Sequence, residues 1–367
     1  MIPSHRAPNP RKKRISLVLG GGGMKGFAHI GVLQAVNELG IEPTLYAGTS
    51  IGALLAAAFA GGLPAGEMAE RAISMRRRDL FRINHLGMIK DRMNAQSIYL
   101  EDPLRRLVES VVPRGTFADL GKPLLVNTVD LERATQVVWG APGLDQVTIQ
   151  DAVYASCALP GFFPPGRVAA RYCVDGGVVD NLPVQVAALW SDVIIAVDVG
   201  TSEMEPFTGD QSRGFANIYM RAASTMMHSL QQFPLTGWQG PPMVLIRPRC
   251  EGDWLSFAST EQTIKEGYRS AKSALAGWQA YLDQDGGIFP RRHVEIEVSR
   301  DRCIGCGLCA ALAPNIMGLD ASGKAFARTR IVEWSPADGD FVPACPTNAI
   351  IARTLRDAEL PKVESAS

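Results

Sequence analysis

Residues 15–26 read ISLVLGGGGMKG, and this stretch decides the fold. The apolar run Ile15–Leu19 predicts a buried parallel strand, because a strand covered on both faces shows no polar alternation. Four glycines then break the strand, and residues 24–39 have the apolar spacing of a helix that Gly40 ends. The order of strand, glycine turn and helix is typical of α/β proteins.

The same order recurs directly afterwards. A predicted strand over 43–47 leads through the turn 48–52 into a predicted helix over 53–60. Further strands are predicted for residues 124–129, 136–139, 171–174 and 193–199, with helical segments between several of them. We therefore expect an α/β fold, a layered domain with a mainly parallel sheet and flanking helices.

The turn at 48–52 reads GTSIG and matches the nucleophile elbow G-x-S-x-G. A serine on such a turn is held in a strained backbone conformation and exposes its hydroxyl at the C-terminal edge of the sheet. Gly48 and Gly52 are needed because side chains there would collide with the neighbouring strand and helix. The helix N-terminus also offers N–H groups to a developing oxyanion. Ser50 is therefore the candidate nucleophile.

The earlier glycine loop has two interpretations. Residues 21–26 fit G-x-G-x-x-G, which also describes a dinucleotide-binding turn. That interpretation requires an acidic residue at the end of the second strand, whereas Glu42 precedes that strand. The pattern favours the alternative, a row of backbone donors that forms an oxyanion hole beside Ser50.

A general base for Ser50 is less easily assigned. A Ser-His-Asp triad needs a late histidine, and the five histidines of the chain are His5, His29, His85, His228 and His293. His228 falls inside a predicted helix over 215–233, and a hydrolase that uses it remains an alternative. Asp175 is the more attractive candidate, because it ends a predicted strand and two glycines follow it.

Three motifs in chain order, GGGGMKG (20–26), GTSIG (48–52) and DGG (175–177), resemble the patatin-like phospholipase family. The stretch 155–165 resembles the segment that precedes the aspartate in bacterial members. The resemblance covers about residues 15–283 and implies a Ser50–Asp175 dyad without histidine. It also implies acyl transfer to Ser50 from a phospholipid, lysophospholipid or other acyl ester, followed by hydrolysis.

The remaining site residues follow from that resemblance. The implied oxyanion hole comprises the backbone amides of Gly21, Gly22, Gly23 and Met24. The glycines that shape and support the turns are Gly26, Gly48, Gly52, Gly176 and Gly177.

Seven cysteines are unevenly distributed along the chain. Cys157, Cys173 and Cys250 are scattered, and we interpret them as small buried apolar residues. The other four have the spacing C-x2-C-x2-C followed by a remote Cys-Pro: Cys303, Cys306, Cys309 and Cys345. This spacing is typical of an iron–sulfur cluster, whereas zinc usually takes two separated C-x2-C pairs.

A two-cluster ferredoxin would carry further cysteines. The place of a fourth cysteine in the first run is Ala313, and the second run would fall at Ser335, Asp338 and Phe341. Residues 293–356 therefore resemble a single-cluster [4Fe–4S] ferredoxin domain of small α+β fold. The expected cofactor is one [4Fe–4S] cluster on the four late cysteines.

Composition limits the remaining possibilities. The chain has 367 residues, 46% hydrophobic, and Lys+Arg and Asp+Glu each count 37, so a nucleic-acid partner is not expected. No apolar run is long enough for a membrane span, and the basic N-terminus lacks the apolar segment of a secretory signal. We expect a cytoplasmic protein with peripheral contact at the inner membrane surface. The run 76–78, three arginines, fits either a solvated face or a contact with anionic head groups.

The predicted organisation is a flexible tail (1–14), a patatin-like acyl hydrolase domain (15–283), a linker (284–292), a [4Fe–4S] domain (293–358) and a second tail (359–367). The expected function is lipid acyl hydrolysis, with a cluster whose role is regulatory, electron-transferring or structural. The alternative is an electron-transfer protein with a redox partner, in which the patatin-like domain is a binding scaffold.

Overall fold

The computed structural model describes residues 12–85, 97–200, 234–250 and 256–355, with isolated residues between 218 and 230 and residue 359. Apart from those isolated positions, the predicted helix over 215–233 lies outside the described residues, as does His228.

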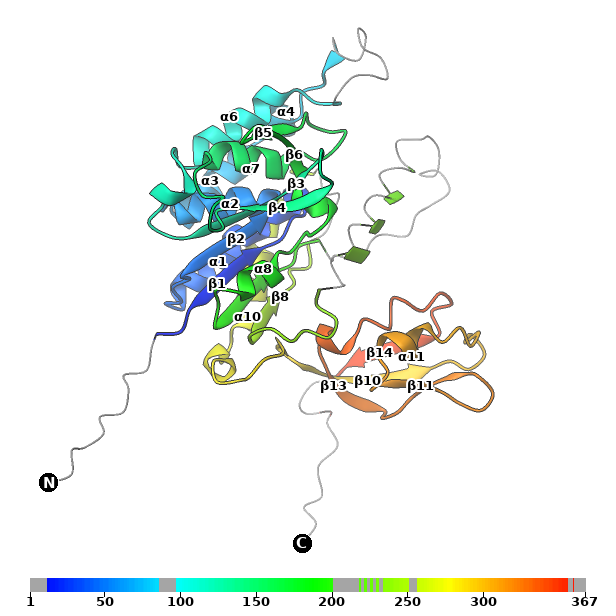
Figure 1. Ribbon diagram of the computed structural model, residues 1–367. Coiled ribbons are helices and arrows are strands. Elements are labelled where there is room, and N and C mark those ends of the chain that lie inside the picture. Colours follow the sequence, from blue (N-terminus) through cyan, green and yellow to red (C-terminus); the bar gives the residue numbers. More distant parts are fainter. Residues whose placement is uncertain are drawn as a thin grey trace, which may run out of the picture.

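A nine-stranded sheet forms the centre of the large domain (Figure 1), in the order β5-β6-β3-β2-β1-β7-β8-β9 with β4 also paired to β3. The strands are β1 (Ile15–Leu19), β2 (Leu45–Thr49), β3 (Leu124–Asp130), β4 (Thr135–Trp139), β5 (Gly166–Val168), β6 (Arg171–Asp175), β7 (Val193–Val197), β8 (Met243–Ile246) and β9 (Ile288–Phe289). The neighbouring strands β3, β2, β1, β7, β8 and β9 pair in parallel. Strands β4 and β6 each pair antiparallel with β3, and β5 pairs antiparallel with β6. The prediction of a mainly parallel α/β sheet is confirmed.

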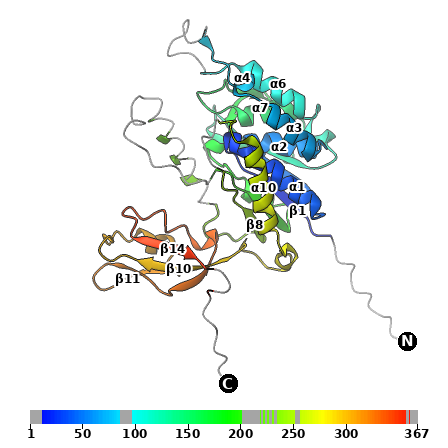
Figure 2. The ribbon, with the colours of Figure 1, turned by 180° about the vertical axis from the view of Figure 1, so that it is seen from behind.

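Helices cover both faces of the sheet, which makes the domain layered (Figures 1 and 2). The helices are α1 (Ala28–Glu38), α2 (Ile51–Ala60), α3 (Ala65–Ser74), α4 (Arg77–Leu80), α6 (Glu101–Val111), α7 (Ile149–Cys157), α8 (Val184–Ala188) and α10 (Thr260–Ala274). Along β1, Leu17 and Leu19 enter the larger core with α1, α2 and α7, whereas Val18 enters the smaller core with α8. Successive strand residues point to opposite faces, so a strand buried on both must be apolar throughout.

The first predicted helix begins differently from its prediction. Residues 23–27 form the 3-10 helix η1 (Gly23–Phe27), and the α-helix starts at Ala28. Gly26 lies so close to the elbow that a Cβ there would be 2.2 Å from the Ile51 side chain. Short 3-10 turns are common at the N-termini of α-helices, and apolar spacing alone does not distinguish the two.

In the C-terminal domain, the described residues form two small sheets and a short helix. A three-stranded sheet has the order β13 (Ile331–Trp334), β10 (Arg292–Val298), β14 (Ile350–Thr354), and β11 (Met317–Leu319) pairs with β12 (Ala325–Ala327). The helix is α11 (Leu308–Leu312), and further 3-10 turns among the described residues are η3 (Phe117–Asp119), η4 (Gly176–Val178), η5 (Trp278–Tyr281) and η6 (Pro336–Asp338). This is the small α+β fold expected of the region.

The connection between the domains is shorter than the predicted linker. β9 lies inside the segment 284–292 and pairs with β8 of the large sheet, and β10 of the small domain begins at Arg292. The division of the chain into domains at these limits stays a prediction. Among the helices that the structure describes, none is both long and apolar enough to cross a membrane.

Candidate active site and cysteine pocket

Ser50 occupies the turn between β2 and α2 in a strained backbone conformation. Its φ is 57° and its ψ is −130°, a region that residues with side chains rarely adopt. The elbow is also tightly packed, because a Cβ on Gly52 would be 2.1 Å from the Leu19 carbonyl oxygen. A Cβ on Gly48 would be 2.5 Å from the Gly52 carbonyl. Glycine is therefore required at both positions, as the G-x-S-x-G pattern predicts.

Strand β3 brings Asp175 to the elbow. Thr49, the last residue of β2, pairs with Asn127, and the next residue of β3, Thr128, pairs with Asp175. The Ser50 hydroxyl lies near the Asp175 carboxylate and lowers the pKa of that carboxyl as a side-chain hydrogen-bond donor. The Gly177 N–H donates to the same carboxylate at 2.8 Å.

Asp175 is buried, and its burial decides its protonation. Desolvation raises the pKa of this carboxyl from 3.8 to about 6, although the hydrogen bonds from Ser50 and Gly177 act in the opposite direction. The group is therefore largely ionised at neutral pH and basic enough to accept a proton, which is the property required of a general base.

The end of α7 anchors both of these residues. The Ser156 hydroxyl accepts the Ser50 N–H at 2.9 Å and donates to the Asn127 carbonyl at 2.7 Å. The Cys157 thiol donates to the Ser50 carbonyl at 3.2 Å, and the Asp175 N–H donates to the Ala158 carbonyl at 3.0 Å. Burial raises the pKa of Cys157 well above its ordinary value, so it remains a neutral thiol. The sequence interpretation of Cys157 as a small buried residue did not include this contact.

The glycine loop after β1 lies against Ser50. A Cβ on Gly21 would be 3.1 Å from the Ser50 Cβ. Gly21 is held by Asn181, because its N–H donates to the Asn181 carbonyl and its own carbonyl accepts from Asn181 Nδ2, both at 3.0 Å. The Gly21 amide is thus already engaged within the protein. The amides at the start of η1 differ, since a 3-10 helix leaves its first N–H groups without an intrahelical acceptor.

A buried network joins the loop after Asp175 to β2 and β3. Asn127 Nδ2 donates to the Asp180 carbonyl at 2.6 Å, and the Thr49 hydroxyl donates to the same oxygen at 3.1 Å. Gln136 Nε2 donates to the Asp180 carboxylate at 3.2 Å. Burial raises the pKa of Asp180. These contacts fix residues 175–181 relative to the elbow, and no local sequence signal reveals them.

His29 is buried beside the glycine loop. Its Nε2 lies 2.8 Å from the Gly20 carbonyl, and Nδ1 has no partner among the described residues. Burial lowers its pKa to about 4, so the ring is neutral and its Nε2 donates to Gly20. His293 belongs to the C-terminal domain in β10, and His85 is exposed. Within the described chain, the elbow thus has Asp175 as its titratable partner.

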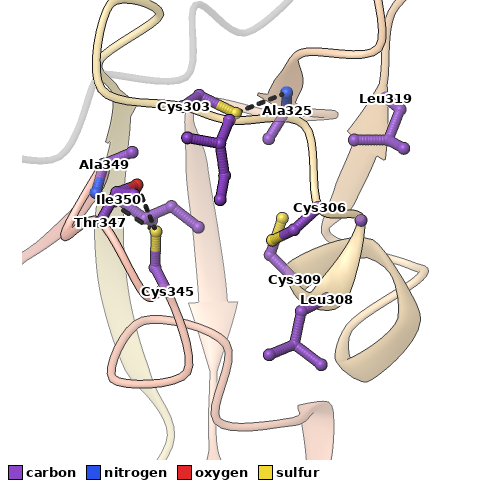
Figure 3. A pocket seen from close by; sticks show the side chains of 12 residues that line it. Cys303, Cys306, Leu308, Cys309, Leu319, Ala325, Cys345, Thr347, Ala349 and Ile350 are labelled. Carbon is purple, nitrogen blue, oxygen red and sulfur yellow. Dashed lines mark hydrogen bonds between the residues drawn. The ribbon is translucent and has the colours of Figure 1, made fainter.

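The four late cysteines line one pocket of the C-terminal domain (Figure 3). It holds ≈ 330 Å³, part of it open to solvent, and apolar side chains such as Ile304, Leu308 and Leu319 complete the lining. The chain winds around it through left-handed residues, since φ is 74° at Gly305 and 78° at Gly307.

Backbone N–H groups point at the cysteine sulfurs. The Ala325 N–H donates to Cys303 Sγ at 3.4 Å and the Ala349 N–H to Cys345 Sγ at 3.2 Å (Figure 3). Burial raises the pKa of Cys345, but the N–H groups of Ala349 and Thr347 outweigh it, so the pKa is lowered overall. Such donors stabilise thiolates, which are the ligands of iron–sulfur clusters.

The donor set fits a cluster better than a single ion. In the described chain, no three His, Cys, Asp or Glu side chains converge closely enough to hold one metal ion. Each iron of a cubane takes only one thiolate, so cluster ligands surround a cavity instead of meeting at a point.

The positions of a second cluster are filled by packed side chains. Ala313 and Phe341 are each 1% exposed and belong to the core of the small domain. Ser335 and Asp338 cap η6, where the Asp338 carboxylate accepts the Ser335 N–H at 2.8 Å.

The two domains are joined by direct contacts. The Gly237 N–H donates to the Ala337 carbonyl at 2.8 Å, and Ala337 packs against the smaller core of the large domain. That smaller core includes Ile194 and Ala196 of β7 and Met243 and Leu245 of β8. The cysteine domain therefore packs against the part of the large domain that β7 and β8 form.

The fold and the site define a layered α/β protein with a serine elbow next to a buried aspartate, joined to a small four-cysteine domain. Residues 17–188 match the family model described as patatin-like phospholipase, and residues 296–352 match that of the 4Fe-4S single cluster domain. The chain carries a patatin-like phospholipase domain followed by a 4Fe-4S single cluster domain, and the resemblance of both regions is confirmed.

Two curated proteins are similar to parts of this chain. An uncharacterized NTE family protein of Mycobacterium tuberculosis is 33% identical over 194 residues, which are 53% of this chain and 51% of that protein. Patatin-like phospholipase domain-containing protein 6 of Homo sapiens is 30% identical over 315 residues, which are 78% of this chain and 22% of that protein. The chain thus spans about half of the mycobacterial relative and a smaller part of the human one. The crystal structure of VipD from Legionella pneumophila aligns with a TM-score of 0.38 and 15% identity, covering 73% of this chain and 67% of that chain.

Proposed function

We propose that the protein is a serine lipid acyl hydrolase in which Ser50 is the nucleophile and Asp175 the general base. One observation carries this proposal: the hydroxyl of a strained elbow serine lies beside a buried carboxylate, and burial raises the pKa of that carboxyl to about 6. The patatin-like phospholipase domain at residues 17–188 supports lipid ester chemistry.

The first half of the reaction acylates Ser50. As Ser50 Oγ attacks the carbonyl carbon of the ester, Asp175 accepts the hydroxyl proton. The tetrahedral oxyanion collapses, the bond to the leaving oxygen breaks, and the proton on Asp175 passes to the departing alcohol or lysolipid. The product is an acyl ester of Ser50.

The second half repeats these proton transfers with water. Asp175 accepts a proton from the attacking water, the oxyanion forms again, and Ser50 Oγ leaves with the proton from Asp175. The fatty acid departs, and the hydrogen bond between Ser50 and Asp175 is restored.

The backbone amides of Gly22, Gly23 and Met24 are proposed to form the oxyanion hole. These residues start η1 beside Ser50, where N–H groups lack intrahelical acceptors. Gly21 is left out of the set, although the sequence resemblance included it, because its N–H donates to Asn181. Its role is instead to hold the loop at the elbow.

The substrate class is a phospholipid, lysophospholipid or other acyl ester. Support comes from the family of the large domain and from the name of the human relative, of which this chain spans only a part.

We further propose that one [4Fe–4S] cluster binds Cys303, Cys306, Cys309 and Cys345. Their common pocket, the N–H donors to two sulfurs and the filled positions of a second cluster support this count. Such a cluster supplies one-electron transfer when bound. The contacts of Ala337 with Gly237 and with the smaller core of the large domain favour a structural or regulatory link to the hydrolase.

A second candidate function is electron transfer with a redox partner, the patatin-like domain being a scaffold. The test is ester hydrolysis by anaerobically purified protein, before and after reduction, with Ser50→Ala as the blank. Turnover that depends on Ser50 supports the hydrolase, and a change on reduction supports regulation by the cluster. Absence of Ser50-dependent turnover on several ester classes contradicts the hydrolase and favours the scaffold.

A further inference from the structure

Helix α4 lies at the end of the large domain that is remote from the cysteine domain (Figures 1 and 2). The residues in and after this helix contribute to a surface that is both basic and apolar. We call it the basic apolar surface and define it by five exposed residues: Arg77, Arg78, Arg82, Ile98 and Leu100. Ile98 and Leu100 are each 39% exposed. The surface thus combines exposed apolar side chains with positive charge.

Backbone pairing holds the apolar residues together. The Leu100 N–H donates to the Arg82 carbonyl, and the Asn84 N–H donates to the Ile98 carbonyl, both at 2.9 Å, while Ile83 bridges Tyr99. In an antiparallel pair, residues directly opposite each other share a face. Leu100 therefore shares its face with Arg82 and, two residues along the segment, with Ile98, whereas Ile83 and the buried Tyr99 lie on the opposite face.

The arginines of this surface carry uncompensated charge. Within the described chain, Arg77, Arg78 and Arg82 form no ion pair, whereas Arg71 pairs with Glu67 and Arg105 with Glu101. Between residues 70 and 85 there are five arginines against two acids, and one of these acids, Asp79, caps α4. Of these arginines, Arg82 is paired with the exposed Leu100 through its backbone.

The same segments are connected to the elbow. The N–H groups of Ile98 and Tyr99 donate to the carbonyls of Gly161 and Phe162, on the loop that follows α7. The end of α7 holds Ser50 through Ser156 and Cys157. When the protein binds a partner through this surface, these contacts hold Ser50 at a fixed position relative to that partner.

We propose that the basic apolar surface docks on an anionic phospholipid bilayer, an inference that rests on the proposed lipid hydrolase and names how it meets its substrate. Guanidinium groups bind lipid phosphates, and isoleucine and leucine enter the acyl boundary. A purely acidic polymer would satisfy the arginines but leave the apolar side chains in water, so the bilayer fits both features.

The test is co-sedimentation of the full-length protein with phosphatidylcholine vesicles, with and without phosphatidylglycerol. We expect binding to the anionic vesicles that weakens with salt. The variant Arg77→Ala/Arg78→Ala/Arg82→Ala should lower the partition coefficient on the order of 100-fold. Replacing the same arginines by lysine should retain most of the binding, and Ile98→Ser/Leu100→Ser should weaken binding even at low salt.

The matched control is Arg114→Ala/Lys122→Ala/Arg167→Ala, which removes the same charge from exposed positions elsewhere on the large domain. Hydrolysis of a soluble ester provides a separate readout, since it should be unchanged in the triple arginine variant. Equal losses in the control and surface variants, or no binding of the unaltered protein to anionic vesicles, overturn the docking proposal. Failure of Ser50-dependent hydrolysis with vesicle binding intact overturns the proposed function instead.

Discussion

Ser50 and Asp175 lie at one site although 125 positions separate them in the sequence, because adjacent residues of β3 bring them together. Asn127 pairs with the residue before Ser50, and Thr128 pairs with Asp175 itself. The geometry of the proposed dyad is therefore a property of the sheet register. Because a shift of one residue would turn side chains to the other face, this register is strongly specified.

The pH dependence of hydrolysis should report the carboxyl of Asp175. The base must be ionised, and burial raises its pKa to about 6. We expect kcat/KM to fall about tenfold per pH unit well below pH 6 and to level off above neutrality. A pH profile with a soluble ester measures this. A flat profile between pH 5 and 7 would assign the base to another group.

Asp175→Asn should inactivate the enzyme and stabilise the fold at neutral pH. Between pH 3.8 and about 6 the folded state binds more protons than the unfolded state, so the carboxyl makes stability fall as pH rises. Removing the charge should recover up to about 3 kcal/mol at pH 8 and little at pH 4. Urea unfolding at both pH values checks the sign, and an equal effect at both would contradict it.

Ser50→Gly should be inactive but more stable than Ser50→Ala. The serine backbone has a φ of 57°, a conformation that costs side-chain-bearing residues about 1–3 kcal/mol and costs glycine little. Ser50→Ala removes the hydroxyl and keeps the strain. Thermal unfolding of the two variants under identical conditions gives the comparison, and equal midpoints would show that the elbow stores no strain.

Ser156→Ala should reduce both stability and kcat, because it leaves the Ser50 N–H without its acceptor and the Asn127 carbonyl without its donor. The expected loss is about 1–3 kcal/mol. Ser110→Ala is a matched control, since that exposed hydroxyl donates only to the Leu107 carbonyl. If both variants keep the same kcat, Ser156 does not position the elbow.

Cys345→Ser should abolish the visible absorbance of the cluster and lower the iron and acid-labile sulfide content of anaerobically purified protein. Cys345 is remote in sequence from the other three cysteines and lines the same pocket. Cys250→Ser, a buried cysteine of the large domain, should leave both contents unchanged. Zinc in place of iron and sulfide in the unaltered protein would contradict the cluster assignment.

The sequence was sufficient for the main features of the fold because their signals are local. Strands such as Ile15–Leu19 are apolar throughout, and the turns after them need glycine where backbones approach closely, as at Gly52. The two residues of β9 are too few to produce a pattern, and η1 has the apolar spacing of an α-helix.

The anchoring of the site could not be predicted from the sequence. Asn181 binds Gly21 across 160 positions, and Ser156 binds Ser50 across 106. Polar residues of this kind are common in loops and at helix ends, so only their positions in the folded chain distinguish them. The motif alone therefore predicted that the Gly21 amide belongs to the oxyanion hole, whereas in the structure this amide donates to the Asn181 carbonyl.

The central claim is that Ser50 is a nucleophile made reactive by Asp175, and covalent labelling tests it most directly. Protein incubated with an organophosphorus ester should gain one adduct, located on Ser50 by peptide mass spectrometry. Ser50→Ala should gain none, and Asp175→Asn should react far more slowly. An adduct at another residue, or equal labelling rates with and without Asp175, would contradict the account.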